Sequence, residues 1–254
     1  MELLDPLTLA AMAAMGFLAA FIDSVVGGGG LISLPTLMWA GIPMHHALGT
    51  NKMASTMGAC MGAFTFFRSG KMDKKALRLL FPLSFLGAVG GVLLVQQVPP
   101  DFLRPLVVVM LVVIALYSIF HRGWGSNTVV PKVSHRMIIF SRFGIFALGA
   151  YDGFFGPGTG SFMLFLFLLM GYGFVNAAAN ARAANFASNI AAVIAFAYLG
   201  LVDYAYAIPM GLGMVAGAYC GARMAIAKGA AYVRPLFITV TIVLIGKQLL
   251  DLYR

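Results

Sequence analysis

Hydrophobic residues follow one another along this chain in ten segments, separated by short stretches that hold most of the polar and charged residues. Eight segments are close to twenty residues long and two are about half that length. About 20 apolar residues form a helix that crosses the hydrocarbon core of a bilayer. The segments cover residues 7–26, 31–40, 50–67, 76–97, 102–120, 137–155, 161–170, 180–199, 204–227 and 232–252. The pattern predicts an all-α integral membrane protein with about eight to ten membrane segments.

The composition makes lipid the solvent for most of the protein surface. Of the 254 residues, 61% are hydrophobic and only 10% are charged, and the mean hydropathy is +0.93. A soluble domain carries roughly 25% charged residues, so this chain has too few to cover a water-facing shell. The net charge of +9 comes from Lys and Arg between the apolar segments. That placement is typical of membrane topology signals and does not indicate a nucleic-acid partner.

The two parts of the chain repeat each other. Residues 1–120 form a first membrane repeat, residues 121–136 a polar linker, and residues 137–254 a second membrane repeat. Near the start, a shift of 129 residues places Asp23 on Asp152. Further along, a shift of 130 pairs charged, glycine and proline positions: Lys52 with Arg182, Gly70 with Gly200, Asp73 with Asp203, Gly87 with Gly217, Gly91 with Gly221, and Arg104-Pro105 with Arg234-Pro235. We infer a duplication.

The basic residues predict opposite orientations for the two repeats. Loop 68–75 is rich in Lys and Arg, and the linker 121–136 is basic too, so both are expected in the cytoplasm. The counterpart of the first loop, residues 201–203, has no basic residue and is expected outside. Each repeat would then contain a broken-helix hairpin that does not cross, plus three spanning helices, with both chain termini outside. Inverted repeats with interrupted helices recur in secondary transporters.

Each short segment follows an aspartate and a glycine-rich interruption. The first interruption runs from Asp23 to Gly30 and the second from Asp152 to Gly160. Glycine exposes backbone amides, which bind anions where a helix begins. The alternative is that these glycines only allow close packing, which is the role expected for the glycines at 87–91 and 217–221. The candidate anion-facing residues are Gly28, Gly29, Gly30, Gly158, Thr159 and Gly160.

One cation in each repeat is predicted near the start of a long apolar helix. Lys52 follows Thr50 and Asn51, and Arg182 shares a helix face with Asn185 and Asn189. A cation is unfavourable at a helix N-terminus, and a bound anion would relieve that conflict. We expect the two cations to meet an anion near the midplane.

Other roles for these charges stay open. Lys52 and Arg182 could instead reach the headgroups, or pair with Asp23 and Asp152 as structural bridges. The two aspartates would then neutralise the cations, and a coupled transporter could also use them to carry protons.

The chain resembles the TauE/SafE family of sulfite exporters over essentially its whole length. The resemblance rests on Asp23 with the glycines that follow it, on residues 50–52, and on the Asp-Gly-Phe-Phe-Gly-Pro stretch that begins at Asp152. It implies transport of sulfite, sulfonates or other organosulfur anions across the bacterial inner membrane. The chain departs from the commoner glycine-only second interruption at Pro157 and Thr159, so the resemblance leaves the substrate open.

The sequence therefore predicts a secondary active permease for small anions that works by alternating access, with proton coupling open. The alternatives are a passive anion channel and a membrane-embedded enzyme. The enzyme is the weaker one, because all four histidines fall in loops and form no catalytic or metal-binding motif. We expect no cofactor, no metal and no catalytic residue. The expected partners are a small anionic substrate and membrane lipid, and a homodimer is left open.

Overall fold

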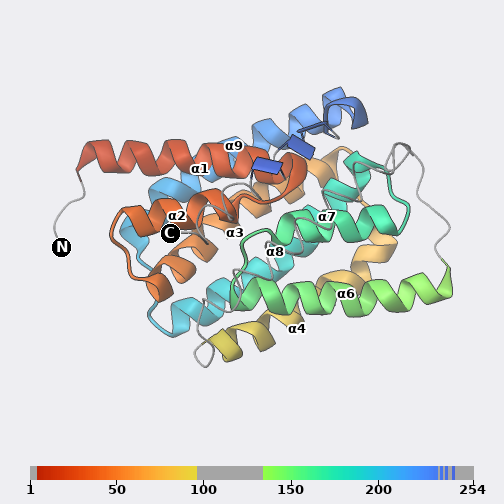
Figure 1. The fold of residues 1–254 in the computed structure, drawn as a ribbon, viewed down its shortest axis with the longest axis horizontal. Helices are drawn as coiled ribbons and strands as arrows, with labels where there is room; N and C mark the ends of the chain where they lie inside the picture. Colours follow the sequence, from red (N-terminus) through yellow and green to blue (C-terminus); the bar gives the residue numbers. More distant parts are fainter. Residues whose placement is uncertain (1–4, 96–133, 234, 237, 240–241, 244–254) are drawn as a thin grey trace.

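A computed structural model describes residues 5–95 and 134–233, together with 235–236, 238–239 and 242–243. Every regular element in these ranges is helical (Figure 1). The predicted segment 102–120, most of the linker 121–136 and most of segment 232–252 lie outside the described residues. The helices are α1 (Pro6–Val26), α2 (Gly30–Trp39), α3 (Met44–Arg68), α4 (Lys74–Val95), α6 (His135–Phe154), α7 (Thr159–Leu169), α8 (Phe174–Tyr198) and α9 (Tyr204–Lys228).

Most helix ends agree with the hydrophobic pattern to within two residues, but α3 and α8 begin earlier than predicted. They start at Met44 and Phe174 rather than at residues 50 and 180. Hydropathy marks only the apolar part of a helix, whereas the backbone continues through polar residues wherever its hydrogen bonds are kept. Lys52 and Arg182 therefore lie about 12 Å inside their helices. The prediction that they stand at helix N-termini is wrong.

Glycines interrupt the helices where the sequence predicts. Gly27 and Gly28 have φ of 80° and 88°, and Gly156 and Gly158 have φ of 96° and 86°, a region that side chains disfavour. The helices that follow, α2 and α7, have 10 and 11 residues and are too short to cross a membrane. By contrast, α1 and α6 belong to the four described helices that are long and apolar enough to cross, with α4 and α9. Helix length therefore supports the predicted non-crossing hairpin for its second arm, α2 or α7, but not for its first arm, α1 or α6.

The two parts of the chain exchange packing partners. Helix α1 packs along α9 and α6 packs along α4, on opposite sides of the molecule, while α3 and α8 contact each other between these pairs (Figure 1). Helix α8 is largely enclosed, with 16 of its 25 residues buried. Small residues allow the outer pairs to approach closely. A Cβ added to Gly217 would lie 2.1 Å from the carbonyl oxygen of Phe17, and one added to Gly87 would lie 2.1 Å from that of Phe146.

Two hydrogen bonds show that α3 and α8 run antiparallel. The Asp203 N–H, just after the end of α8, donates to Thr50 Oγ1 near the start of α3 over 2.9 Å. The Asp73 N–H, just after the end of α3, donates to Asn180 Oδ1 near the start of α8 over 2.8 Å. The two bonds join residues related by the 130-residue shift. Each end of the central helix pair is therefore tied by one such bond.

The α4–α6 contact gives a sharp test of close packing, because two adjacent glycines of α4 differ in their surroundings. A Cβ on Gly91 would lie 1.9 Å from the Ala150 carbonyl oxygen, whereas one on Gly90 would meet nothing within 4 Å. We expect Gly91→Ala to destabilise the purified protein by about 1–3 kcal/mol through overpacking. Gly90→Ala should be neutral or stabilising by up to about 1 kcal/mol. Thermal unfolding in detergent measures both, and equal effects of the two variants would contradict the packing described.

Candidate functional site

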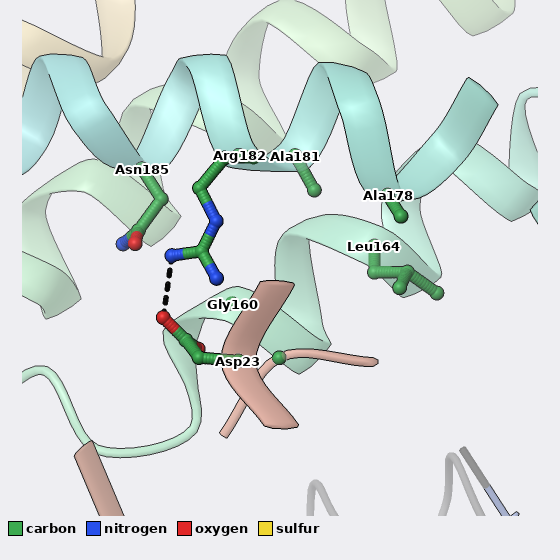
Figure 2. Close-up of a pocket in the computed structure, with 8 residues that line it drawn as sticks. Asp23, Gly160, Leu164, Ala178, Ala181, Arg182 and Asn185 are labelled. Atoms are coloured by element: carbon green, nitrogen blue, oxygen red, sulfur yellow. Dashed lines mark hydrogen bonds and ion pairs between the residues drawn. The ribbon is translucent and has the colours of Figure 1, made fainter. Parts of the chain in front are cut away.

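An ion pair joins Arg182 of α8 to Asp23 of α1. Arg182 Nη1 lies 2.5 Å from Asp23 Oδ2, and Nη2 donates to Ser24 Oγ over 3.2 Å. The second carboxylate oxygen of Asp23 accepts the Gly29 N–H of the first interruption over 3.0 Å. Figure 2 shows the guanidinium extending from α8 toward the Asp23 carboxylate, with Asn185 further along the same helix. A cation of the second half of the chain is thus neutralised by the first half.

A second ion pair joins the two halves of the chain in the opposite sense, with its cation in the first half. Lys52 Nζ of α3 lies 2.8 Å from Asp152 Oδ1 of α6, and both side chains are only 3% exposed. The other carboxylate oxygen of Asp152 accepts from Ser188 Oγ over 2.6 Å and from Asn185 Nδ2 over 3.4 Å. Three donors therefore satisfy the buried carboxylate. The alternative of pairing between these cations and aspartates is confirmed in the geometry.

The two cations lie at different depths along the central helices. Gly62 of α3 faces Arg182, since a Cβ added there would lie 3.2 Å from the arginine side chain. Gly62 is ten residues beyond Lys52, which is about 15 Å along a helix. Because α3 and α8 are antiparallel, Lys52 lies toward one end of the helix pair and Arg182 toward the other. The expectation that both cations meet a single anion does not fit this spacing.

The two interruptions touch each other between the ion pairs. A Cβ on Gly27 would lie 2.1 Å from the Ser161 nitrogen, and one on Gly30 would lie 3.3 Å from Pro157 Cα. The second interruption also reaches both charged pairs: a Cβ on Gly156 would be 2.7 Å from Lys52 Nζ, and one on Gly160 would be 2.8 Å from Asp23 Oδ1. In this conformation the backbones leave no room for an anion between the two tips.

Two small cavities border Arg182, and both are also lined by Asp23. Each has a volume of about 10 Å³, which is close to the room needed by one water molecule. The first is completed by Gly27, Gly160, Leu164, Ala178, Ala181 and Asn185 (Figure 2). The second is completed by Ala19, Ala20, Gly29, Ser55, Gly58, Ala59 and Met214. Space around the charges therefore exists at Arg182, whereas neither cavity is lined by Lys52 or Asp152.

Arg182 also has a donor that the protein does not use. Its Nε is buried and has no hydrogen-bond partner among the described residues. Leaving a buried donor unpaired costs about 1–3 kcal/mol. The side chain as a whole is only 4% exposed, whereas that of its partner Asp23 is 17% exposed. The Arg182 pair is thus less completely satisfied than the Lys52 pair, and more accessible.

Several predicted site residues lie in this region but make internal contacts. Asn51 Oδ1 accepts from Ser33 Oγ over 2.6 Å. Asn189 Nδ2 donates to the Asn185 carbonyl within α8 over 2.7 Å, and Thr159 Oγ1 donates to the Gly156 carbonyl over 2.7 Å.

The remaining predicted residues shape the turns or lie apart from the ion pairs. Gly28 and Gly158 supply positive φ, and Gly30 packs on Pro157. Thr50 is placed elsewhere: it accepts from Asp203 at the helix end, and residues two apart on a helix do not share a face.

Sequence reasoning missed two serines that contact the ion pairs. Ser24 is a partner of Arg182 and Ser188 is a partner of Asp152. A signal for Ser188 was available, because it follows Asn185 by three residues and so lies on the same face of a helix. Ser24 directly follows Asp23 at the end of α1, where only the fold shows which way its hydroxyl points.

The fold and the site define a multi-pass helical membrane protein whose core holds one buried and one partly buried ion pair between its two parts. Among the described residues, no group of three or more His, Cys, Asp or Glu side chains lies close enough to hold a metal ion. Charged groups inside a membrane protein are rare and mark pathways for ions or substrates.

Comparison with known proteins gives the family. The model of the sulfite exporter TauE/SafE family matches residues 12–247, and the chain belongs to this family. A probable membrane transporter protein, ORF9, of Sinorhizobium sp. is 38% identical over 96% of this chain and 93% of its own length. A probable membrane transporter protein of Haemophilus influenzae is 34% identical over 96% and 95%. The probable membrane transporter protein YfcA of Escherichia coli K12 is 34% identical over 98% and 92%. No solved structure matches the chain.

The Lys52–Asp152 ion pair, which is almost fully buried, predicts that substitutions of its two residues have strongly coupled effects on stability. In Lys52→Gln the Asp152 carboxylate stays buried without its cation, which we expect to cost about 3–5 kcal/mol. The double variant Lys52→Gln/Asp152→Asn removes both charges and should recover most of that loss. Thermal unfolding of the purified variants tests this expectation. A double variant no more stable than the single one would show that the charge pairing contributes little.

Proposed function

We propose that this protein is a secondary active permease for small oxyanions, of the kind represented by sulfite, sulfonates and other organosulfur anions, and that Arg182 is the cation that binds them. One observation carries the proposal: a buried arginine with an unused Nε lies between two small cavities, next to the more exposed of the two paired aspartates. The membership in a sulfite exporter family supports the substrate class, and the names of its relatives as probable membrane transporters support the activity.

Asp23 holds the position that a substrate oxyanion would take on Arg182. A guanidinium presents its donors as a planar fork, which suits a carboxylate and an oxyanion of sulfur equally well. Binding would therefore require Asp23 to move away or to accept a proton, while Arg182 turns its fork toward the anion. The Gly29 N–H, released from Asp23, and the amide of Asn185 would supply further donors. Such an exchange would couple one anion to the charge state of Asp23.

The Lys52–Asp152 pair would hold the two repeats together toward the other end of the α3–α8 helix pair. The antiparallel central helices and the exchanged packing of α1 with α9 and of α4 with α6 support two repeats of inverted topology. Opening at one end would then separate Arg182 from Asp23, and opening at the other would separate Lys52 from Asp152. The contact between the glycine tips and the size of the cavities favour this alternating carrier over an open channel.

The inverted topology predicts opposite accessibility at the first residues of α4 and α9, which are related by the 130-residue shift. Lys74 and Tyr204 are both exposed. In a background without Cys60 and Cys220, Tyr204→Cys should react with a membrane-impermeant thiol reagent on intact cells. Lys74→Cys should react only after the membrane is opened. Labelling of both positions from the same side would contradict the inverted arrangement, the inner-membrane orientation and the external termini that we propose.

The anion site predicts different results for two substitutions in the same ion pair. In Asp23→Asn, Arg182 keeps its charge and should still bind an oxyanion. The double variant Arg182→Gln/Asp23→Asn buries no unpaired charge but should lose binding by about tenfold or more, as expected for charge-assisted hydrogen bonds. Thermal stabilisation of the purified proteins by sulfite, sulfate, thiosulfate, sulfoacetate and acetate measures binding, because a ligand stabilises the state that binds it.

The Lys52→Gln/Asp152→Asn variant is the matched control, since it removes one buried ion pair without touching Arg182. It should still be stabilised by the same anion. The site would be overturned if an anion stabilised the Arg182→Gln/Asp23→Asn variant to the same degree as the unmodified protein. Uptake into liposomes with and without an imposed proton gradient then separates the carrier from the channel. Rapid flux that ignores the gradient would favour a channel.

A further inference from the structure

A large hollow lies between the ends of α3 and α9, away from both ion pairs. Its volume is about 710 Å³, far larger than the cavities at Arg182. Four residues of α3, the Ser69 that caps it and four residues of α9 line the hollow: Met61, Phe64, Thr65, Arg68, Ser69, Tyr219, Arg223, Ile226 and Ala227. We infer that this hollow binds the headgroup of an anionic phospholipid, with its acyl chains along the apolar wall.

Two arginines give the hollow its charge. Arg68 lies over the ring of Phe64 at 5.7 Å, and Arg223 lies over the ring of Tyr219 at 5.1 Å. Neither forms an ion pair with a carboxylate in the part of the chain that the structure describes. Two like charges that line one hollow repel each other, and an anion between them removes the repulsion. A phosphodiester accepts the fork of a guanidinium in two parallel hydrogen bonds.

Two of the three hydroxyl groups that line the hollow donate to backbone carbonyls. Thr65 Oγ1 donates to the Met61 carbonyl over 2.8 Å, and Ser69 Oγ donates to the Phe66 carbonyl over 2.7 Å. The protons of Thr65 and Ser69 are therefore used by backbone carbonyls of α3, and the two arginines and the Tyr219 hydroxyl supply the available hydrogens. The guanidinium groups are donors suited to a phosphate. A phosphate bound in the hollow would therefore be held mainly by its charge.

The hollow lies on the outer face of the α3–α9 pair. Helix α9 meets α1 through Gly217 and Gly221, whose added Cβ atoms would lie 2.1 and 2.4 Å from the carbonyls of Phe17 and Phe21. Tyr219 lies two residues from each of these glycines and is therefore on a different face. It is 42% exposed, and Phe64 of α3 is 53% exposed. The hollow thus faces the surroundings of the protein, and along α9, which is long and apolar enough to cross a membrane, those surroundings are lipid.

The dimensions and position of the hollow fit a lipid headgroup at the membrane surface. The lining of α3 from Met61 to Ser69 extends about 12 Å along the helix axis, from the polar end of the helix into its apolar part. The equivalent positions of the other repeat, at the 130-residue shift, are Tyr198 and Leu93 in place of Arg68 and Arg223. Charge is thus present on one of two related surfaces, at the helix ends that adjoin the basic loop 68–75. Anionic lipids are concentrated where such basic segments lie.

Retention of lipid by the purified protein tests this site. The protein is incubated in detergent with phosphatidylglycerol or with phosphatidylcholine of the same chains, and bound lipid is counted by native mass spectrometry. We expect retention of phosphatidylglycerol in clear excess over phosphatidylcholine. Arg68→Gln/Arg223→Gln should weaken the retention of phosphatidylglycerol by about tenfold or more, because both charge-assisted contacts are lost. Arg142→Gln, which removes an exposed arginine of α6, is the matched control and should retain it.

Four other results would contradict the lipid site. Equal retention of the two lipids, or unchanged retention by the double arginine variant, would overturn the site. A double variant that keeps its lipid but changes its oligomeric state would assign the hollow to a second copy of the chain. If inorganic phosphate alone stabilised the protein against heat as much as phosphatidylglycerol does, the hollow would be assigned to a soluble anion. If the double variant does not fold, Arg68→Lys/Arg223→Lys keeps the charge and should still prefer phosphatidylglycerol. The result does not depend on the anion site at Arg182.

Discussion

Two ion pairs in the interior, each formed between the first and the second half of the chain, are the constraint on which the rest of this fold depends. A charge taken out of water costs several kcal/mol, and a partner must compensate it at short range. Here Asp23 compensates Arg182 and Lys52 compensates Asp152. Each half of the chain thus supplies the partner for a charge of the other half. The exchanged helix packing and the glycine contacts between backbones bring the charges within reach.

The ion pairs are related by the repeat, yet their surroundings have diverged. Asp152 accepts from a lysine, a serine and an asparagine and is almost fully enclosed. Asp23 accepts from Arg182 and from a backbone amide, is partly exposed and borders two cavities. A pair that is fully satisfied favours one rigid arrangement, whereas a pair with an unused donor and adjacent space can exchange partners. The two ion pairs thus differ in enclosure and in the space beside them.

Much of the fold could be predicted from the sequence, because lipid imposes a direct relation between apolar length and helix. The interruptions at Gly27 and Gly156 were also readable, since positive φ requires glycine. The starts of α3 and α8 were not, because hydropathy does not detect helical residues that are polar or merely small. That error placed Lys52 and Arg182 at helix ends. The pairing of each cation with an aspartate of the other repeat needed the tertiary arrangement, since Asp23 and Arg182 are 159 residues apart.

The departures from a glycine-only second interruption act inside the tip. The Thr159 hydroxyl donates to the Gly156 carbonyl, and the Pro157 carbonyl accepts from the Tyr151 hydroxyl. Both contacts close the turn upon itself and upon α6, and neither directs a polar group at Arg182. They stiffen the segment that lies between the two ion pairs. In the permease that we propose, selectivity among oxyanions would therefore come from the polar groups around Arg182 itself, namely Ser24, Ser55, Asn185 and the Gly29 amide.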